Sequence, residues 1–134
     1  MKKAIEFLRT HWDVALATVG PNNRPKLRAF QIMRIDDDNT IYFATSKDKE
    51  VYKQLMSNPY MEILAMDGNV SVRVAGVAEF NVPDKTAESI YFENTILQGL
   101  YEDYRSVVFF IMNIQEIDYY DMTTNPPVMD TYSV

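Results

Sequence analysis

The chain has 134 residues, no cysteine and a formal net charge of −6 at pH 7, and 47% of its residues are hydrophobic. This length and composition fit a single domain with a well-filled core and exclude a disordered chain. The lack of cysteine excludes disulfides, cysteine-ligated metal clusters and thiol nucleophiles, no apolar run approaches the roughly 18 residues of a membrane helix, and the acidic balance argues against a nucleic-acid-binding surface.

The first 57 residues are expected to form two helices and three strands. Apolar residues at spacings of three and four indicate the helices, whereas β-rich apolar runs separated by the turn sequences GPNNRP and DDDN indicate the strands. In chain order the elements are a helix at 2–10, strands at 13–20, 26–35 and 40–45, and a helix from about Asp48 to Ser57. The short connections between the strands predict two hairpins.

Strands also dominate the remainder of the chain. Asp67-Gly68 is a strong hairpin signal between two strands, and Pro83-Asp84 opens a helix. In chain order the elements are strands at 60–66 and 70–80, a helix from Pro83-Asp84 to about Glu93, a broken helical turn within 96–104, strands at 106–114 and 116–122, and an irregular tail at about 123–134.

These elements predict a β-rich α+β fold, a mostly antiparallel barrel of about six to seven strands with short helices at its periphery. The reason is that strands and helices do not alternate regularly, as a parallel βαβ fold requires. We expect one domain over residues 1–134, with no internal repeat. Glu6 and Arg9 interrupt any signal-peptide core, so we expect a cytoplasmic protein.

The charges are distributed unevenly along the chain. Residues 1–53 hold ten cations and seven anions, whereas residues 54–134 hold three cations and twelve anions. Seven of the thirteen cations lie between Arg24 and Lys53. A local basic cluster on an acidic protein favours a small anionic ligand over a polyanion.

Thr45 and Ser46 lie at the junction between a predicted strand and a predicted helix. Free backbone N–H groups and the helix dipole at such a junction favour a phosphate. Lys47, Lys49 and Lys53 could neutralise that phosphate, and without an anion their positive charges at the start of a helix are unfavourable. The alternative is that Ser46 only caps the helix and the lysines are solvated.

Arg28 is a further candidate for contact with this phosphate. Side chains alternate along a strand, so Arg28 shares a face with Phe30, and a buried arginine requires a partner. Its planar guanidinium suits a phosphate; the alternative is an ion pair with Asp13 or with the acidic residues 36–38. The amide of Gln31 could bind a flat heterocycle or satisfy neighbouring strand residues.

The ordered set of sequences LATVG, RAFQI, IYFATSKDKEVYKQLMSNPYMEIL and VRVAGVAEF resembles the FMN-binding split β-barrel superfamily typified by pyridoxamine 5′-phosphate oxidase. Within that superfamily the chain is most similar to the small flavin-reductase and nitroimidazole-resistance-like members. The resemblance covers residues from about Val14 to Glu79 well. It implies a homodimer with two flavin sites at the subunit interface, and we expect the aromatic residues and methionines of 107–122 to supply part of that interface.

The resemblance also implies which residues bind the cofactor. It places the strand from Arg28 to Met33 along FMN, with Arg28 at the phosphate. The Arg-Lys pair that binds phosphate in the family falls on Glu50 and Val51 here, so we expect one of the nearby lysines to replace it. The implied cofactor-binding residues are Arg28, Ala29, Phe30, Gln31, Ala44, Thr45, Ser46, Lys47, Lys49 and Lys53, and no metal site is predicted.

The function implied by the resemblance is an FMN-dependent oxidoreductase that reduces a small electrophile with electrons from NADH or NADPH. Oxidation of pyridoxamine phosphate itself is not expected. The substrate-phosphate lysine of that oxidase falls on Met33, and its C-terminal Trp and Arg are absent. Two alternatives stay open: a flavin-binding carrier or sensor without turnover, and a cofactor-free β-barrel interaction module.

Two isolated residues have local interpretations. His11, the single histidine, is expected to be a capping or surface residue, because one histidine cannot form a metal site. Arg73 either points into the flavin site of a second subunit or forms an ion pair with Glu62 or Glu79.

Overall fold

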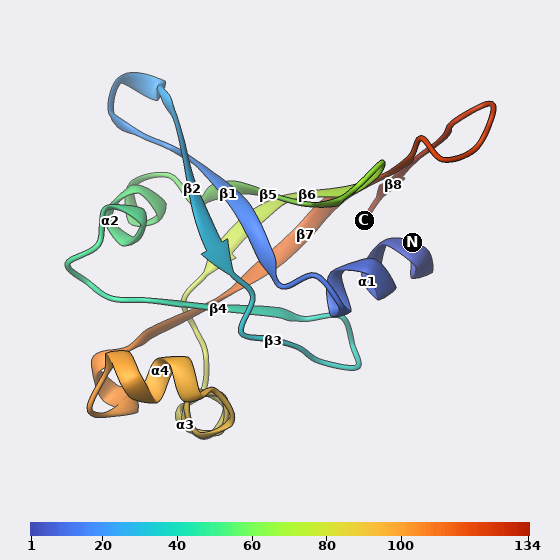
Figure 1. Cartoon of the computed structure of the whole chain (residues 1–134). Coiled ribbons are helices and arrows are strands. Elements are labelled where there is room, and N and C mark those ends of the chain that lie inside the picture. The colour runs from blue at the N-terminus through green and yellow to red at the C-terminus, as the bar shows by residue number, and fades with distance from the viewer.

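The computed structural model describes residues 1–134 and contains eight strands and four α-helices (Figure 1). The helices are α1 (Lys2–Arg9), α2 (Glu50–Ser57), α3 (Asp84–Glu93) and α4 (Thr95–Leu100). The strands are β1 (Asp13–Val19), β2 (Pro25–Gln31), β3 (Arg34–Ile35), β4 (Ile41–Thr45), β5 (Tyr60–Asp67), β6 (Val70–Glu79), β7 (Val108–Asp121) and β8 (Val128–Ser133). The β-rich α+β class predicted from the sequence is confirmed. The longest helix, α3, has ten residues, and none has the length and apolar character needed to cross a bilayer.

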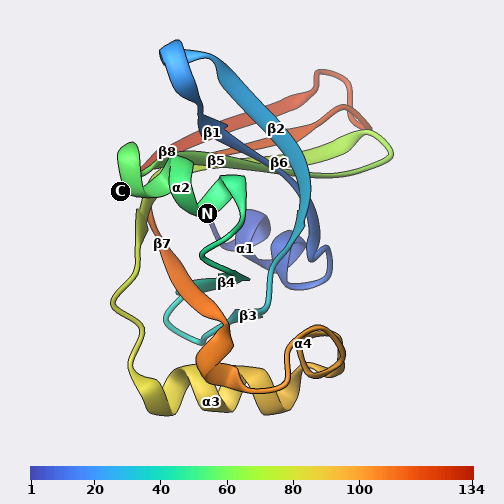
Figure 2. The same cartoon turned by 90° about the vertical axis from the view of Figure 1, so that its left-hand side faces the viewer.

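The strands form one antiparallel sheet in the order β2-β1-β5-β6-β7-β4-β3, and β8 pairs with β7. The two ends of this order, β2 and β3, are neighbours in sequence. The Ile32 N–H donates to the carbonyl of Trp12 beside β1, and the Met33 N–H donates to the carbonyl of Tyr42 on β4, both at 2.8 Å. Two consecutive residues therefore join opposite ends of the sheet, which curls into a barrel (Figure 2).

This closure corrects the single strand expected at 26–35, which is divided into β2 and β3. Ile32 and Met33 are both buried, whereas a continuous strand would alternate its side chains between two faces. Ile32 packs into the main core and Met33 packs into a second cluster beside α3. The chain therefore turns between two hydrophobic clusters at this point.

The strands expected at 106–114 and 116–122 are one continuous strand, β7. One side of β7 pairs with β6, and its other side pairs first with β4 up to Met112 and then with β8 from Glu116. The change of partner opens the barrel between β4 and β8. A register shift at Ala75/Gly76 accommodates the bend, and a Cβ at Gly76 would lie 2.3 Å from the backbone oxygen of Asn113.

The tail expected to be irregular at 123–134 is a turn followed by β8. Pairing with β7 imposes the strand, and the hydroxyl of Thr131 donates to Asp118 at 2.7 Å. The tail's own sequence, with two prolines and little apolar alternation, gives no such signal.

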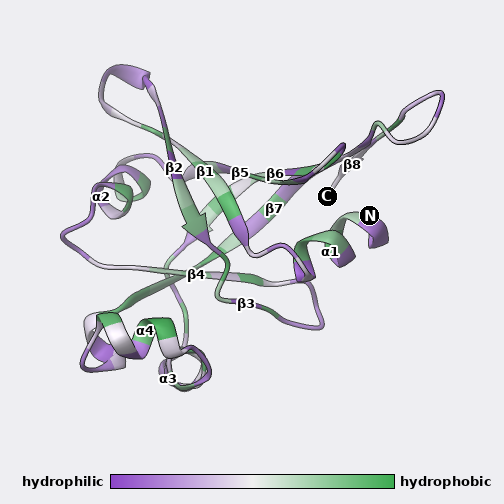
Figure 3. Cartoon of the chain, in the orientation of Figure 1, coloured by the Kyte–Doolittle hydropathy of each residue, from purple (hydrophilic) through white to green (hydrophobic).

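The main core lies inside the curled sheet and beneath α1 and α2. Its centre is an aromatic group in which Phe43 stacks on Phe110 at 5.3 Å, with Phe30 and Phe80 at its edges. Phe109, Phe110 and Met112 are buried in the monomer, whereas Tyr119 and Tyr120 are half-buried and Met122 is exposed, so an interface formed by part of 107–122 stays a prediction. Polar residues gather in the connecting turns, such as the β1–β2 turn (Figure 3).

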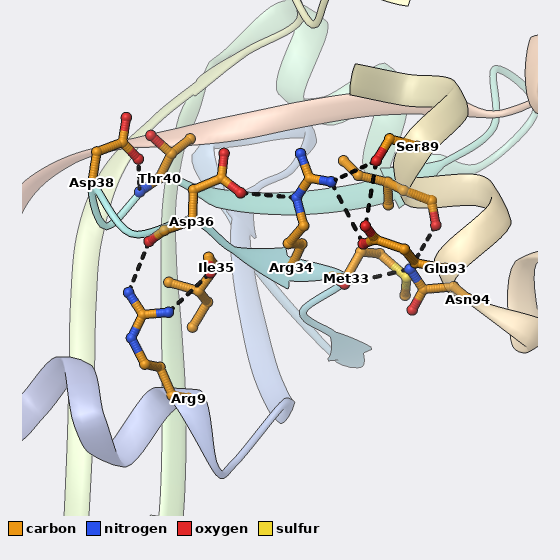
Figure 4. Close-up of polar contacts among 11 residues, drawn as sticks. Arg9, Met33, Arg34, Ile35, Asp36, Asp38, Thr40, Ser89, Glu93 and Asn94 are labelled. Atoms are coloured by element: carbon orange, nitrogen blue, oxygen red, sulfur yellow. Dashed lines mark hydrogen bonds and ion pairs between the residues drawn. The ribbon is translucent and has the colours of Figure 1, made fainter. Parts of the chain in front are cut away.

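Helices on two sides hold β3 in place (Figure 4). Arg34 forms ion pairs with Asp36 at 2.9 Å and with Glu93 of α3 at 3.5 Å. Arg9 of α1 donates to the carbonyls of Ile35 and Asp36 at 2.9 and 2.8 Å. These contacts fix the short strand that completes the barrel.

Candidate functional site

Arg28 is the centre of the candidate site. It lies on β2, and its side chain points between β1 and α2. Its Nη1 donates to the hydroxyl oxygen of Thr18 at 2.8 Å, and its Nη2 donates to the side-chain oxygen of Gln54 at 2.7 Å. Thr18 in turn donates to the same Gln54 oxygen at 2.6 Å, which completes a ring of three hydrogen bonds.

The guanidinium of Arg28 has no carboxylate partner. The alternative of an ion pair with Asp13 or with residues 36–38 is wrong, because Asp13 accepts from Gln31 and Asp36 pairs with Arg34. Thr18 and Gln54 are 3% and 8% exposed, so the partners of the guanidinium are neutral and buried. Burial lowers the pKa of Arg28 below its ordinary value, but arginine stays charged in proteins. The site therefore holds an uncompensated positive charge.

The loop between β4 and α2 brings further positive charge. Lys47, Lys49 and Lys53 are exposed, and none of them takes part in an ion pair of the structure. The pKa of Asp48 is lowered mainly by its hydrogen bond from Ser46, and further by the charges of Lys49 and Lys53. Lys49 and Lys53 thus both add positive charge around this carboxyl group.

Thr45 and Ser46 are buried at the end of β4, and α2 begins only at Glu50. The Ser46 hydroxyl donates to Asp48 at 2.5 Å. The alternative in which Ser46 caps the helix is wrong, because α2 begins after Lys49 and has no side-chain cap. Ala44 lies on β4 opposite Phe109 and packs against the second hydrophobic cluster.

A polar cleft of about 560 Å³ separates the β1–β2 turn from α2. The residues that line it are Val19, Gly20, Pro21, Asn22, Asn23, Glu50, Lys53, Gln54, Ser57 and Asn58. Gln54 belongs both to this cleft and to the hydrogen-bonded ring around Arg28. Gln54 thus connects Arg28, which does not itself line the cleft, to a cleft that Lys53 also lines, whereas Lys47 and Lys49 lie outside it.

The predicted residues of β2 divide between its two faces. Phe30 points inward and lies 5.9 Å from the ring of Phe43. Ala29 is exposed on the outer face beside Leu27, which is 72% exposed. Gln31 donates to Asp13 at 3.1 Å, so it satisfies a strand neighbour, the second of its two interpretations. β2 pairs only with β1, and its other backbone edge is free.

Sequence reasoning missed Thr18 and Gln54. Each is a polar residue at a core position of an otherwise apolar series: Thr18 continues the inward positions Val14 and Leu16 of β1, and Gln54 lies between Val51 and Leu55 on the buried stripe of α2. Polar residues in core positions need hydrogen-bond partners. That requirement was the signal available in the sequence.

Arg73 lies outside this site. It forms ion pairs with Glu62 at 2.7 Å, with Glu116 at 2.9 Å and with Asp118, and these carboxylates raise its pKa above the ordinary value. The ion pair with Glu62 was one of the three expected arrangements. The interactions link β5, β6 and β7 across the outer face of the sheet.

His11 joins the end of α1 to the β5–β6 turn. Its ring stacks on Phe7 with centroids 3.9 Å apart, and its Nε2 lies 3.0 Å from an oxygen of Asp67. Hydrogen bonds to Asp67 and to the Phe7 carbonyl raise the pKa of His11. Both ring nitrogens are thus engaged, and His11 is a structural residue near the surface.

The curled antiparallel sheet, opened between β4 and β8, defines a split β-barrel with a cationic site at the junction of β1, β2 and α2. The family described as pyridoxamine 5′-phosphate oxidase matches residues 1–121, and the chain belongs to this family. A search of curated proteins finds no match.

Solved structures of similar fold come from several bacteria. A NimC/NimA family protein from Clostridium acetobutylicum is 21% identical with a TM-score of 0.82, over 100% of this chain and 92% of that chain. General Stress Protein 26 from Bacillus anthracis str. Sterne is 19% identical with a TM-score of 0.78, over 99% and 97% of the two chains. A pyridoxamine 5′-phosphate oxidase-related, FMN binding protein from Nostoc punctiforme is 15% identical with a TM-score of 0.75, over 99% and 93%.

Proposed function

We propose that the protein is an FMN-binding oxidoreductase that reduces a small electrophile with electrons from NADH or NADPH. The single observation that carries this proposal is the positive charge of Arg28, fixed by two neutral buried partners and left without a carboxylate. A partly buried charge without a counter-ion is unfavourable, and a bound phosphate would supply the counter-ion. Membership of the pyridoxamine 5′-phosphate oxidase family and the FMN-binding neighbour support the identity of the ligand.

The residues present fit FMN in charge. Arg28 would hold the phosphate through its planar guanidinium, and Lys53, Lys49 and Lys47 would add positive charge around it. The free edge and exposed outer face of β2 at Ala29 would leave backbone groups available to the flavin ring. When bound, FMN would supply the electron transfer, and the chain's own residues would anchor, orient and partly cover it.

The same residues argue against oxidation of pyridoxamine phosphate. Met33 occupies the position that the resemblance assigns to a substrate-phosphate lysine. It is buried beside Ile90 in the second hydrophobic cluster and carries no charge. A substrate with its own phosphate therefore gains no anchor at this position, and we infer a small, weakly charged acceptor such as a nitro compound.

A homodimer with flavin at the subunit interface is part of the proposal. Its surface would be formed by apolar side chains that the monomer leaves exposed on β2, β5 and β8, among them Leu27, Tyr60 and Met129. Sedimentation measurements on the FMN-loaded protein test this point, and a monomer would contradict it.

The central test is an absorbance spectrum of the purified protein, followed by titration of FMN with detection of flavin fluorescence. We expect the fluorescence of FMN to be quenched on binding. We also expect the visible absorbance of the bound FMN to bleach when NADH or NADPH is added under nitrogen. Reoxidation by a nitroaromatic compound completes the expected cycle. Binding without bleaching supports a carrier or sensor, and no quenching refutes the FMN proposal in favour of a cofactor-free module.

A further inference from the structure

We propose that Gln54 is a positioning residue that makes the site specific for a phosphomonoester. The inference rests on the proposed function and concerns how the chain holds Arg28 ready for its ligand. Gln54 is a neutral side chain on α2 that accepts hydrogen bonds from both Thr18 and Arg28. Its role is to fix the guanidinium without neutralising it.

The two side chains that accept hydrogen bonds from Arg28 are neutral. A partly buried arginine is ordinarily paired with a carboxylate, which orients the guanidinium but cancels most of its field. Here the orientation comes from an amide oxygen at 2.7 Å and a hydroxyl oxygen at 2.8 Å. The guanidinium is therefore held in one place with its full charge, which is the arrangement that a dianionic ligand needs.

The partners of Arg28 in the hydrogen-bonded ring are buried. Gln54 and Thr18 are each more than nine-tenths buried, and their own hydrogen bond is 2.6 Å long. Side chains with so little freedom lose little conformational entropy when a ligand binds. The position of Arg28 is thus set by the fold before the ligand arrives.

The amide nitrogen of Gln54 is available to a ligand. The side-chain oxygen accepts two of the three hydrogen bonds of the ring, from Thr18 and from Arg28. The amide nitrogen has no protein acceptor, and the residue lines the 560 Å³ cleft together with Lys53. An amide nitrogen carries two N–H donors. Gln54 therefore offers donors to the cleft from the same amide group whose oxygen holds Arg28, and an anionic oxygen is a ligand atom that such donors bind.

Two substitutions separate positioning from mere packing. Gln54→Glu keeps the size and the acceptor but places a carboxylate against Arg28, and Gln54→Met keeps the approximate size but removes acceptor and donors. We expect Gln54→Glu to weaken FMN binding by about tenfold or more and Gln54→Met by a few-fold, since charge-assisted phosphate contacts are lost or loosened. Riboflavin, which lacks the phosphate, is expected to bind the wild-type protein and the two variants with Kd values within about twofold of one another.

The controls use variants and probes that do not depend on turnover. Gln115→Glu adds the same negative charge at an exposed position of β7 and is expected to leave FMN binding unchanged. Thermal melting of each unliganded variant reports folding. The rise in melting temperature with inorganic phosphate reports the anion site without any flavin, and we expect it to be reduced in both Gln54 variants.

The outcomes distinguish this inference from the proposed function. FMN binding that is unaffected by Gln54→Met, or riboflavin binding that falls as much as FMN binding, overturns the positioning role and leaves the FMN proposal standing. Phosphate stabilisation that depends on Gln54 in a protein that does not bind FMN supports the anion site and overturns the flavin assignment. A wild-type protein that binds neither FMN nor inorganic phosphate overturns both the positioning role and the FMN proposal.

Discussion

Replacement of Arg28 by alanine tests the charge on which the site depends. Thr18 and Gln54 stay bonded to each other at 2.6 Å when the guanidinium is removed. Because neither buried group is left without a partner, the expected loss of stability is only about 1 kcal/mol. The expected loss of FMN affinity is larger, about 1.5 to 3 kcal/mol for one charge-assisted contact, or roughly 10- to 150-fold in Kd.

The assay is a fluorescence titration of FMN and of riboflavin against wild-type protein, Arg28→Ala and Arg24→Ala. Arg24 lies in the same hairpin, is exposed and forms no ion pair, so its removal costs the same net charge without touching the ring. We expect a large loss for FMN with Arg28→Ala and a small one with Arg24→Ala. Equal losses of FMN and riboflavin affinity with Arg28→Ala would show that Arg28 supports the fold and does not bind a phosphate.

Three further predictions concern other parts of the molecule. Lys49→Ala is expected to weaken FMN binding by less than about 1 kcal/mol and to leave riboflavin binding unchanged, because exposed charges are screened. A loss of FMN affinity as large as that of Arg28→Ala in the same titration would contradict this. Gly76→Ala is expected to lower the free energy of unfolding by about 1 to 3 kcal/mol, since its Cβ would lie 2.3 Å from the backbone oxygen of Asn113. Urea denaturation measures this loss, and an unchanged denaturation midpoint would show that β7 shifts freely. The hydrogen bond of His11 with Asp67 is the largest cause of its raised folded-state pKa, so the stabilising effect is fully present below the unfolded pKa of about 6.5 and is lost as the pH rises through the raised value. Asp67→Asn should reduce this pH dependence of stability, leaving the smaller contribution of the Phe7 carbonyl, and identical stability profiles for the two proteins would refute the linkage.

Local sequence patterns predict the helices and hairpins because these elements depend on nearby residues. The helix ending at Asn58-Pro59 and the hairpin at Asp67-Gly68 are examples in which a turn or capping signal lies within the element itself. The errors fall where distant strands decide the structure. Ile32 and Met33 turn between two clusters because β2 and β3 pair at opposite ends of the sheet, and β8 is ordered by a strand that precedes it.

The candidate site shows the same division. Alternation along β2 predicts that Arg28 faces inward with Phe30, and the structure confirms this orientation. The partners of Arg28 come from β1 and α2, which lie 10 and 26 residues away from it in sequence. The sequence therefore indicates a charge that needs partners, but it does not specify that those partners are neutral.

The position of the site follows from a polarity gradient inside the barrel. In the β1–β2 pair, Val14 lies opposite Phe30 at the closed end, Leu16 lies opposite Arg28, and Thr18 lies nearest the turn with the cleft beyond it. The inward side chains thus change from aromatic and aliphatic to polar over two steps of the pleat. A ring of polar groups at the last step costs little, since its members satisfy one another and border a cleft rather than the core. We therefore expect an anionic ligand group to bind at the end of the hairpin beside α2, toward Gln54, where the inward side chains are polar.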